Sequence, residues 1–184
     1  MKKLVLIVFI ILFTLNVKGE DTLKIIPANY PLNFGYGLGI DYGGIGARFT
    51  YLPLKQIGVF AAIGFNFLNF GYNAGLVYRV TPDKKRVCPY ANFFYGYNAL
   101  IKIKWTTKYD KIYYGFSSGV GLEIHSKKDR NKFFNLELIA PFRTSEFKKD
   151  YKAIKNDPNI KLYYKPFPVL YSIGFHFPIT SIAL

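Results

Sequence analysis

The amino-acid sequence predicts an all-β fold, an eight-stranded antiparallel up-and-down transmembrane β-barrel, and three observations support this. Beyond Pro31, bulky apolar residues alternate with small or polar ones at a period of two, which is typical of strands. The chain contains 18 Phe, 16 Tyr and 16 Gly, residue types that suit strands and turns better than helices. Its mean hydropathy is only +0.10, as expected when every second residue of a strand faces lipid.

The amino terminus has the pattern of an export signal. Two lysines precede an almost unbroken apolar run from Leu4 to Leu15, and Val17 and Gly19 stand where a signal peptidase reads the chain. This run is shorter than the roughly 20 apolar residues that a membrane-spanning helix needs. We therefore expect residues 1–19 to be a cleaved signal peptide and residues 20–184 to form the barrel domain. An uncleaved anchor is the alternative.

The first predicted strand illustrates the alternation. From Asn33 to Tyr42, every second residue is bulky and apolar, and the residues between are Asn, Gly or Asp. Successive side chains of a strand point to opposite faces, so one face is bulky and the other is small or charged. Gly43 and Gly44 then predict a tight hairpin. Similar alternation, over about ten residues each, predicts eight strands: residues 33–42, 45–51, 57–67, 70–79, 91–102, 112–124, 134–140 and 169–177.

The bulky face is expected to face lipid, because the opposite face is too polar for the dry core of a soluble barrel. Tyr42, Tyr51 and Tyr78, near predicted strand ends, suit the aromatic girdles of a membrane barrel. With both termini on the periplasmic side, the connections fall into two sets. We expect the turns at 53–56, 81–86 and 126–132 to be periplasmic, and those at 43–44, 68–69, 104–111 and 143–166 to be extracellular.

The signal peptide, the alternating segments and the Phe-Gly-Tyr pattern, as in Phe34-Gly35-Tyr36 and Phe70-Gly71-Tyr72, resemble one group of proteins. They are similar to the small outer-membrane barrels of the OmpA/OmpX-like type, over about residues 30–178. The resemblance implies an integral barrel in the outer membrane of a Gram-negative bacterium, reached after cleavage of the signal peptide.

The inward face of the expected barrel carries both acids and bases. Buried charge is tolerated only when it is paired, so these residues are expected to form a compensated polar network. Either they are a structural plug, or they gate a narrow conduction path. The network residues are Asp41, Arg48, Arg79, Lys102, Glu123, His125, Glu137 and His176.

A lipid A-modifying enzyme is a further alternative, with His125, Ser126 and Glu137 as its candidate residues. Adjacent strand residues point to opposite faces, so His125 and Ser126 would diverge. We predict no catalytic residues, no cofactor and no metal site, since the two histidines and the single Cys88 are spread along the chain. One cysteine also excludes an internal disulfide.

The chain has 25 Lys and Arg against 11 Asp and Glu, a formal charge of +14. The cations cluster in connections and do not form one stripe, which argues against nucleic acid and favours outer-membrane lipids and lipopolysaccharide as partners. The long connection at 143–166 combines cations with aromatics, and another envelope protein is an alternative partner for it. Its candidate interaction residues are Phe147, Lys148, Lys149, Tyr151, Lys152 and Lys155.

These observations predict a non-enzymatic barrel with a structural, adhesive or partner-binding role through its outer loops. The alternative is a narrow pore or small-ligand transporter, and a lipid-modifying enzyme ranks third.

Overall fold

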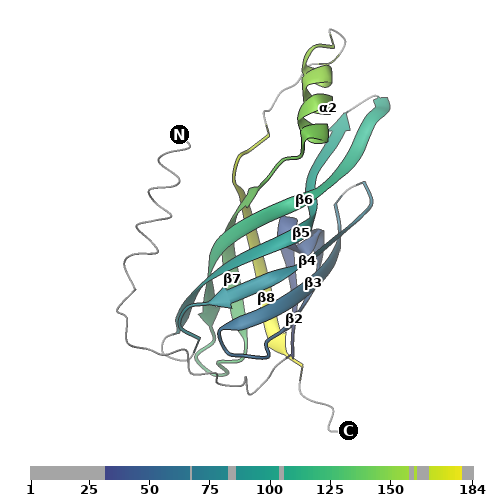
Figure 1. Cartoon of the computed structure of the whole chain (residues 1–184). Helices are drawn as coiled ribbons and strands as arrows, with labels where there is room; N and C mark the ends of the chain where they lie inside the picture. The colour runs from purple at the N-terminus through teal and green to yellow at the C-terminus, as the bar shows by residue number, and fades with distance from the viewer. Residues whose placement is uncertain are drawn as a thin grey trace, which may run out of the picture.

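The structure is a computed structural model that describes residues 32–66, 68–82, 86–103, 106–157, 160 and 166–179. The predicted signal peptide at 1–19 lies outside this part of the chain. Within it, eight strands form one closed antiparallel barrel in which each strand pairs with its neighbours in sequence and β1 pairs with β8 (Figure 1). The strands are β1 (Leu32–Gly39), β2 (Gly44–Tyr51), β3 (Ile57–Phe65), β4 (Phe70–Arg79), β5 (Val87–Ile103), β6 (Thr106–His125), β7 (Phe133–Pro141) and β8 (Leu170–Pro178). The predicted all-β, eight-stranded antiparallel barrel is thereby confirmed.

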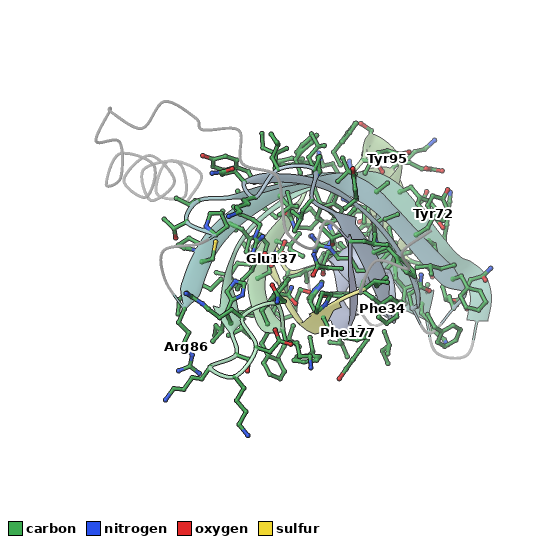
Figure 2. The ribbon with its side chains drawn as sticks, turned by 90° about the horizontal axis from the view of Figure 1, so that it is seen from below. Phe34, Tyr72, Arg86, Tyr95, Glu137 and Phe177 are labelled. Atoms are coloured by element: carbon green, nitrogen blue, oxygen red, sulfur yellow. The ribbon has the colours of Figure 1, made fainter. Side chains whose placement is uncertain are left out.

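The alternation seen in the sequence separates the outer face of the barrel from its interior. In β3 the side chains alternate strictly between exposed and buried from Ile57 to Phe65, and β7 alternates in the same way over most of its length. Figure 2, a view from one end of the barrel, shows Glu137 inside the ring of strands and Tyr72 and Tyr95 outside it. Polar side chains therefore fill the interior, and large apolar side chains cover the outer surface.

The first strand is shorter than the sequence predicts. β1 ends at Gly39, and Ile40–Tyr42 form a short 3₁₀ helix, η1, that turns into the barrel. Gly43 ends η1 with φ 74°, a left-handed conformation that glycine adopts without steric cost. Ile40 and Tyr42 are consequently buried in the interior and do not face outward. The prediction of Tyr42 as an outer girdle residue is wrong for this reason.

The predicted loop at 104–111 is largely strand. β5 pairs with β6 as far as Ile103 and Thr106, whereas β4 stops pairing with β5 at Gly96. On the other side, β7 pairs with β6 only up to Ser117. The residues beyond these points, 97–103 and 106–116, form a two-stranded arm that rises past the rim (Figure 1). The predicted loop lacked apolar alternation because this arm has no barrel interior to line.

One helix, α2 (Ser145–Lys155), stands beside the arm at the same end of the barrel (Figure 1). Thr144 caps its first turn, where the hydroxyl oxygen accepts a hydrogen bond from the Phe147 amide at 3.3 Å. Glu146 near its start and Lys152 and Lys155 near its end suit the helix dipole. α2 occupies the first half of the connection predicted at 143–166. Among the described residues, no helix has both the length and the apolar character needed to cross a bilayer.

Candidate functional site

The interior of the barrel is the main concentration of polar chemistry, and its first part surrounds η1. Asp41 is fully buried and receives a hydrogen bond from Arg48 Nη1 at 3.0 Å and a second from the Ser172 hydroxyl. The Arg48 guanidinium also lies over the Phe60 ring, 3.7 Å from its centroid. A carboxylate and a guanidinium buried together compensate each other's charge, so this pair fixes η1 inside the barrel.

A hydrogen-bonded chain crosses the interior next to this pair. The Tyr42 hydroxyl lies 2.5 Å from His176 Nε2 and donates to Asn135 Oδ1 at 2.8 Å. Asn135 Nδ2 in turn donates to the Tyr90 hydroxyl at 3.2 Å, and Tyr90 donates to Glu137 Oε2 at 2.7 Å. This chain of hydrogen bonds joins η1 to β5, β7 and β8, so each member restrains the position of the next.

Glu137 ends this chain of hydrogen bonds and has no ion-pair partner among the described residues. Its second carboxylate oxygen accepts a hydrogen bond from Asn92 Nδ2 at 2.6 Å. Two donors therefore satisfy a carboxyl group that is almost fully buried. Such a group is tolerated in an interior because its hydrogen-bonding capacity is met.

Glycines on two neighbouring strands make room for Tyr42. A Cβ at Gly37 of β1 would lie 2.7 Å from the Tyr42 ring, and a Cβ at Gly174 of β8 would overlap the Tyr42 ring and hydroxyl. These two glycines face each other across the β1–β8 ladder. The glycine rhythm of the inward face thus has a structural role here, because it opens the space that an inward-turned tyrosine fills.

A second ion cluster lies toward the opposite rim. Arg79 contacts Glu123 Oε2 through Nε at 2.8 Å and through Nη2 at 2.7 Å, and His125 Nε2 lies 3.3 Å from the same oxygen. His125 Nδ1 is 2.6 Å from the Arg130 carbonyl oxygen, which ties the cluster to the turn after β6. Two strands contribute to this cluster, since Arg79 is in β4 and both Glu123 and His125 are in β6.

An apolar cluster formed by Ile40, Phe60, Phe94 and Ile139 also occupies the interior. The remaining free space includes a small cavity bordered by Arg48, Thr50, Glu123 and His176, with room for water and not for an organic ligand. The described part of the interior is therefore filled with side chains, as expected for a barrel of eight strands.

Seven of the eight residues predicted for the interior network are buried there. They are Asp41, Arg48, Arg79, Glu123, His125, Glu137 and His176. Lys102 is the exception: it is exposed, because a β-bulge between Tyr97 and Ala99 shifts the parity of β5 and because it belongs to the arm beyond the rim. The placement of Lys102 in the interior is therefore wrong.

Sequence reasoning missed several residues that hold the network together. The alternation places Tyr42 on the outer face. It gives no face to Tyr90, which precedes the first residue of the strand predicted at 91–102. Asn92, Asn135 and Ser172 stood at inward positions of the alternation, so their parity was a usable signal. At an inward position of such a barrel, a polar residue is therefore predicted to belong to the interior network.

The second candidate site is formed by α2 and the arm on which it packs. Lys111 of the arm contacts Glu146 at 2.6 Å and Asp150 at 3.3 Å, and the Tyr113 hydroxyl donates to Asp150 at 2.8 Å. The Phe147 ring packs edge-on against Tyr113, with centroids 5.2 Å apart. The hydrogen bond from Tyr113, with the nearby Lys111 ammonium, holds the pKa of Asp150 below its ordinary value.

The predicted loop residues divide between two faces of α2. Phe147 is buried and Tyr151 is half-buried, and their rings stack 6.1 Å apart beside the arm. Lys148, Lys149, Lys152 and Lys155 are all exposed. Phe147 is accordingly occupied in packing the helix, and the lysines are the members of this group that are accessible to a ligand. The loop aromatics at 163–164 lie outside the described residues.

The residues considered for lipid-modifying chemistry do not come together. His125 is bound into the ion cluster with Arg79, Glu137 is bound to Tyr90 and Asn92, and Ser126 lies in the turn after β6. Cys88 is buried. In the part of the chain that the structure describes, no three His, Cys, Asp or Glu side chains are grouped so that they could hold a metal ion.

No protein-family model matches the chain, and comparisons with curated proteins and with solved structures gave no significant match.

Proposed function

We propose that this chain is an integral outer-membrane β-barrel that conducts no solute, performs no catalysis, and acts in a structural, adhesive or partner-binding role through its outer arm and helix. One observation carries the proposal. At the outward-facing positions of the described barrel strands, counting β5 up to Tyr95 and β6 from Phe116, there is no Asp, Glu, Lys or Arg. We call this surface the belt.

The belt is too large and too apolar for a protein surrounded by water. Monomeric soluble proteins rarely expose contiguous apolar patches of more than a few hundred Å². Here exposed Leu, Ile, Val, Phe and Tyr side chains occur on the outer side of all eight strands. Six of the strands are 8–10 residues long, close to the 9–11 that a tilted strand needs to cross a bilayer. A hydrocarbon environment satisfies both features.

Tyrosines at the two ends of the belt also support a lipid-facing surface. Tyr51 and Tyr78 lie near one rim, at the ends of β2 and β4, and both are exposed. Tyr72, Tyr95 and Tyr171 are exposed near the other rim. Exposed tyrosines in two bands are typical of the aromatic girdles that flank the lipid-facing band of outer-membrane barrels.

The filled interior supports a barrel that does not conduct. The ion pairs, the hydrogen-bonded chain and the apolar cluster around Phe94 occupy the space that a pore would need. The interior hydroxyls that contact Asp41 and His176, those of Ser172 and Tyr42, are buried, which supports a role other than catalysis.

The test is refolding of the chain, without residues 1–19, into phospholipid vesicles. We expect a β-rich circular dichroism spectrum, a band that migrates differently before and after boiling, and protection of the belt strands from protease. A product that stays in the aqueous phase with no band shift would contradict the proposal. Planar-bilayer recording tests the second part, and stable single-channel conductance would overturn it.

A further inference from the structure

The acidic and the basic side chains of α2 lie on different faces of the helix. Glu146 and Asp150, one turn apart, both contact Lys111 of the arm, and Asp150 also accepts the hydrogen bond from Tyr113. The apolar residues of the helix are on the same side, where Phe147 packs on Tyr113 and Ile154 is buried. The acids and the apolar groups of α2 are therefore used in docking the helix onto the arm.

The opposite face of α2 is left basic. Lys148, Lys152 and Lys155 follow one another at spacings of four and three residues, which places them along a single stripe of the helix. All three side chains are exposed, and among the described residues none lies within 4.0 Å of a carboxylate oxygen. With a rise of 1.5 Å per residue, the stripe spans roughly 10 Å.

The height of this stripe above the barrel is restricted by the chain. β7 ends at Pro141, where it pairs with Ser117 at the rim, and α2 begins at Ser145. The four Cα–Cα steps from Pro141 to Ser145 span at most about 14 Å. The contacts of α2 with β6 hold the helix beside the arm. If the belt lies in lipid, α2 therefore begins close to the polar layer that covers one leaflet and extends away from it beside the arm (Figure 1).

We infer that the lysine stripe of α2, Lys148, Lys152 and Lys155, binds the phosphate groups of a phosphorylated glycolipid in the outer leaflet. This inference rests on the proposed outer-membrane function. Charge complementarity identifies the partner: a row of cations that begins close to the headgroup layer fits a ligand that presents several phosphates there. The fixed orientation of α2 adds to the fit, because the lysines keep one direction relative to the membrane.

The chain offers a matched control. Lys127, Lys128 and Arg130 are three exposed cations in the turn after β6, at the opposite rim of the barrel. The variants K148Q/K152Q/K155Q and K127Q/K128Q/R130Q each replace three cationic side chains by the neutral, polar side chain of glutamine. A difference between them therefore reports the position of the charges and not the net charge of the protein.

The experiment measures binding of the refolded protein, in detergent micelles at low salt, to lipopolysaccharide carrying its phosphates and to the same material after dephosphorylation. A cation near an anionic surface contributes about fivefold in affinity, so loss of three predicts roughly a hundredfold weaker binding for K148Q/K152Q/K155Q. We expect the control variant to bind within about twofold of the wild type. Dephosphorylated material should bind the wild type and the stripe variant equally.

Two results would overturn the inference: equal binding by the wild type and the stripe variant, or an equal loss in both variants. Boiling-dependent migration of all three proteins in phospholipid vesicles, without glycolipid, separates the two proposals. A barrel that inserts in vesicles but does not distinguish phosphorylated glycolipid overturns this inference alone, and a chain that fails to insert overturns the proposed function.

Discussion

The Tyr42 hydroxyl, in the turn after β1, lies 2.5 Å from Nε2 of His176 in β8, although 134 positions separate the two residues. The same hydroxyl donates to Asn135 in β7. One inward-turned side chain thus connects the β1–β2 connection to the strands that close the barrel. The interior network and the closure of the barrel are therefore expected to be energetically coupled.

The first prediction concerns this hydroxyl. Tyr42→Phe leaves buried partners on His176 and Asn135 unsatisfied, and an unsatisfied buried group costs about 1–3 kcal/mol. We expect the free energy of unfolding in detergent, measured with urea, to fall by about that amount. Tyr36→Phe is the control, because Tyr36 faces outward and is exposed. Equal stability of the two variants would show that the network does not hold the barrel closed.

The second prediction concerns the space around the same ring. In Gly174→Ala the new methyl group would overlap the Tyr42 hydroxyl, and overpacking typically costs about 1–3 kcal/mol. Gly115→Ala is the matched control, since its nearest neighbour, Thr144 Cγ2, would be 3.2 Å away. Urea unfolding should place the Gly174 variant clearly below the Gly115 variant. The double variant with Tyr42→Phe should lose less than the sum of the single changes, because the overlapping oxygen is gone.

The alternation of the sequence was sufficient to predict the strand number, the two faces and most of the interior charges. Parity fixes the face of Arg79, Glu123 and Glu137 because their strands are regular and paired on both sides. It failed where local geometry breaks the period. Tyr42 follows a 3₁₀ turn, and Lys102 follows a bulge. At Tyr42 the apolar residues continue the expected order through the break, whereas before Lys102 the consecutive Ala99, Leu100 and Ile101 interrupt the alternation.

The outer site was less predictable for a different reason. The sequence predicts that Phe147 and the lysines of α2 form one interaction site. In the structure Phe147 packs on the arm, and the lysines are exposed on another face of the helix. The sequence predicts a loop at 104–111, where the structure has the arm. Phe147 packs on Tyr113 of this arm. A contact between two connections far apart in sequence cannot be read from the composition of either one.

The third prediction compares two ion pairs of unequal burial. Glu123→Gln leaves the Arg79 guanidinium buried without a counter-charge, and breaking a buried pair typically costs about 3–5 kcal/mol. Glu146→Gln removes the exposed contact with Lys111, where a far smaller loss is expected because solvent screens the pair. The free energy of unfolding of both variants in detergent checks the difference. Similar losses would mean that Arg79 finds water or another acceptor in the Glu123 variant.

The fourth prediction concerns pH and the docking of α2. The pKa of Asp150 is below its ordinary value of 3.8, because of the hydrogen bond from Tyr113 and the Lys111 ammonium. A lowered pKa means that the ionised carboxylate stabilises the docked helix above pH 3.8, and that this contribution is lost as the pH falls through the lowered value. Nuclear Overhauser contacts between the Tyr113 and Phe147 rings should weaken below about pH 4. In Asp150→Asn they should be weaker at neutral pH and should show less change with acid.

The last prediction concerns the belt and separates a lipid-facing surface from a surface that another protein covers. Leu136 faces outward near the middle of β7, between Ile173 of β8 and Leu122 of β6, and it is 45% exposed. In a membrane barrel, an arginine at the bilayer midplane costs about 2–4 kcal/mol, and near an interface about 0–1. Leu136→Arg should therefore reduce the folded fraction in phospholipid vesicles far more than Tyr51→Arg, whose position is at the rim. In detergent micelles, which deform around a charge more easily than a bilayer does, we expect the gap between the two variants to shrink. Equal effects in vesicles would mean that depth in a bilayer does not determine the stability of this barrel, and the belt would then need a different partner.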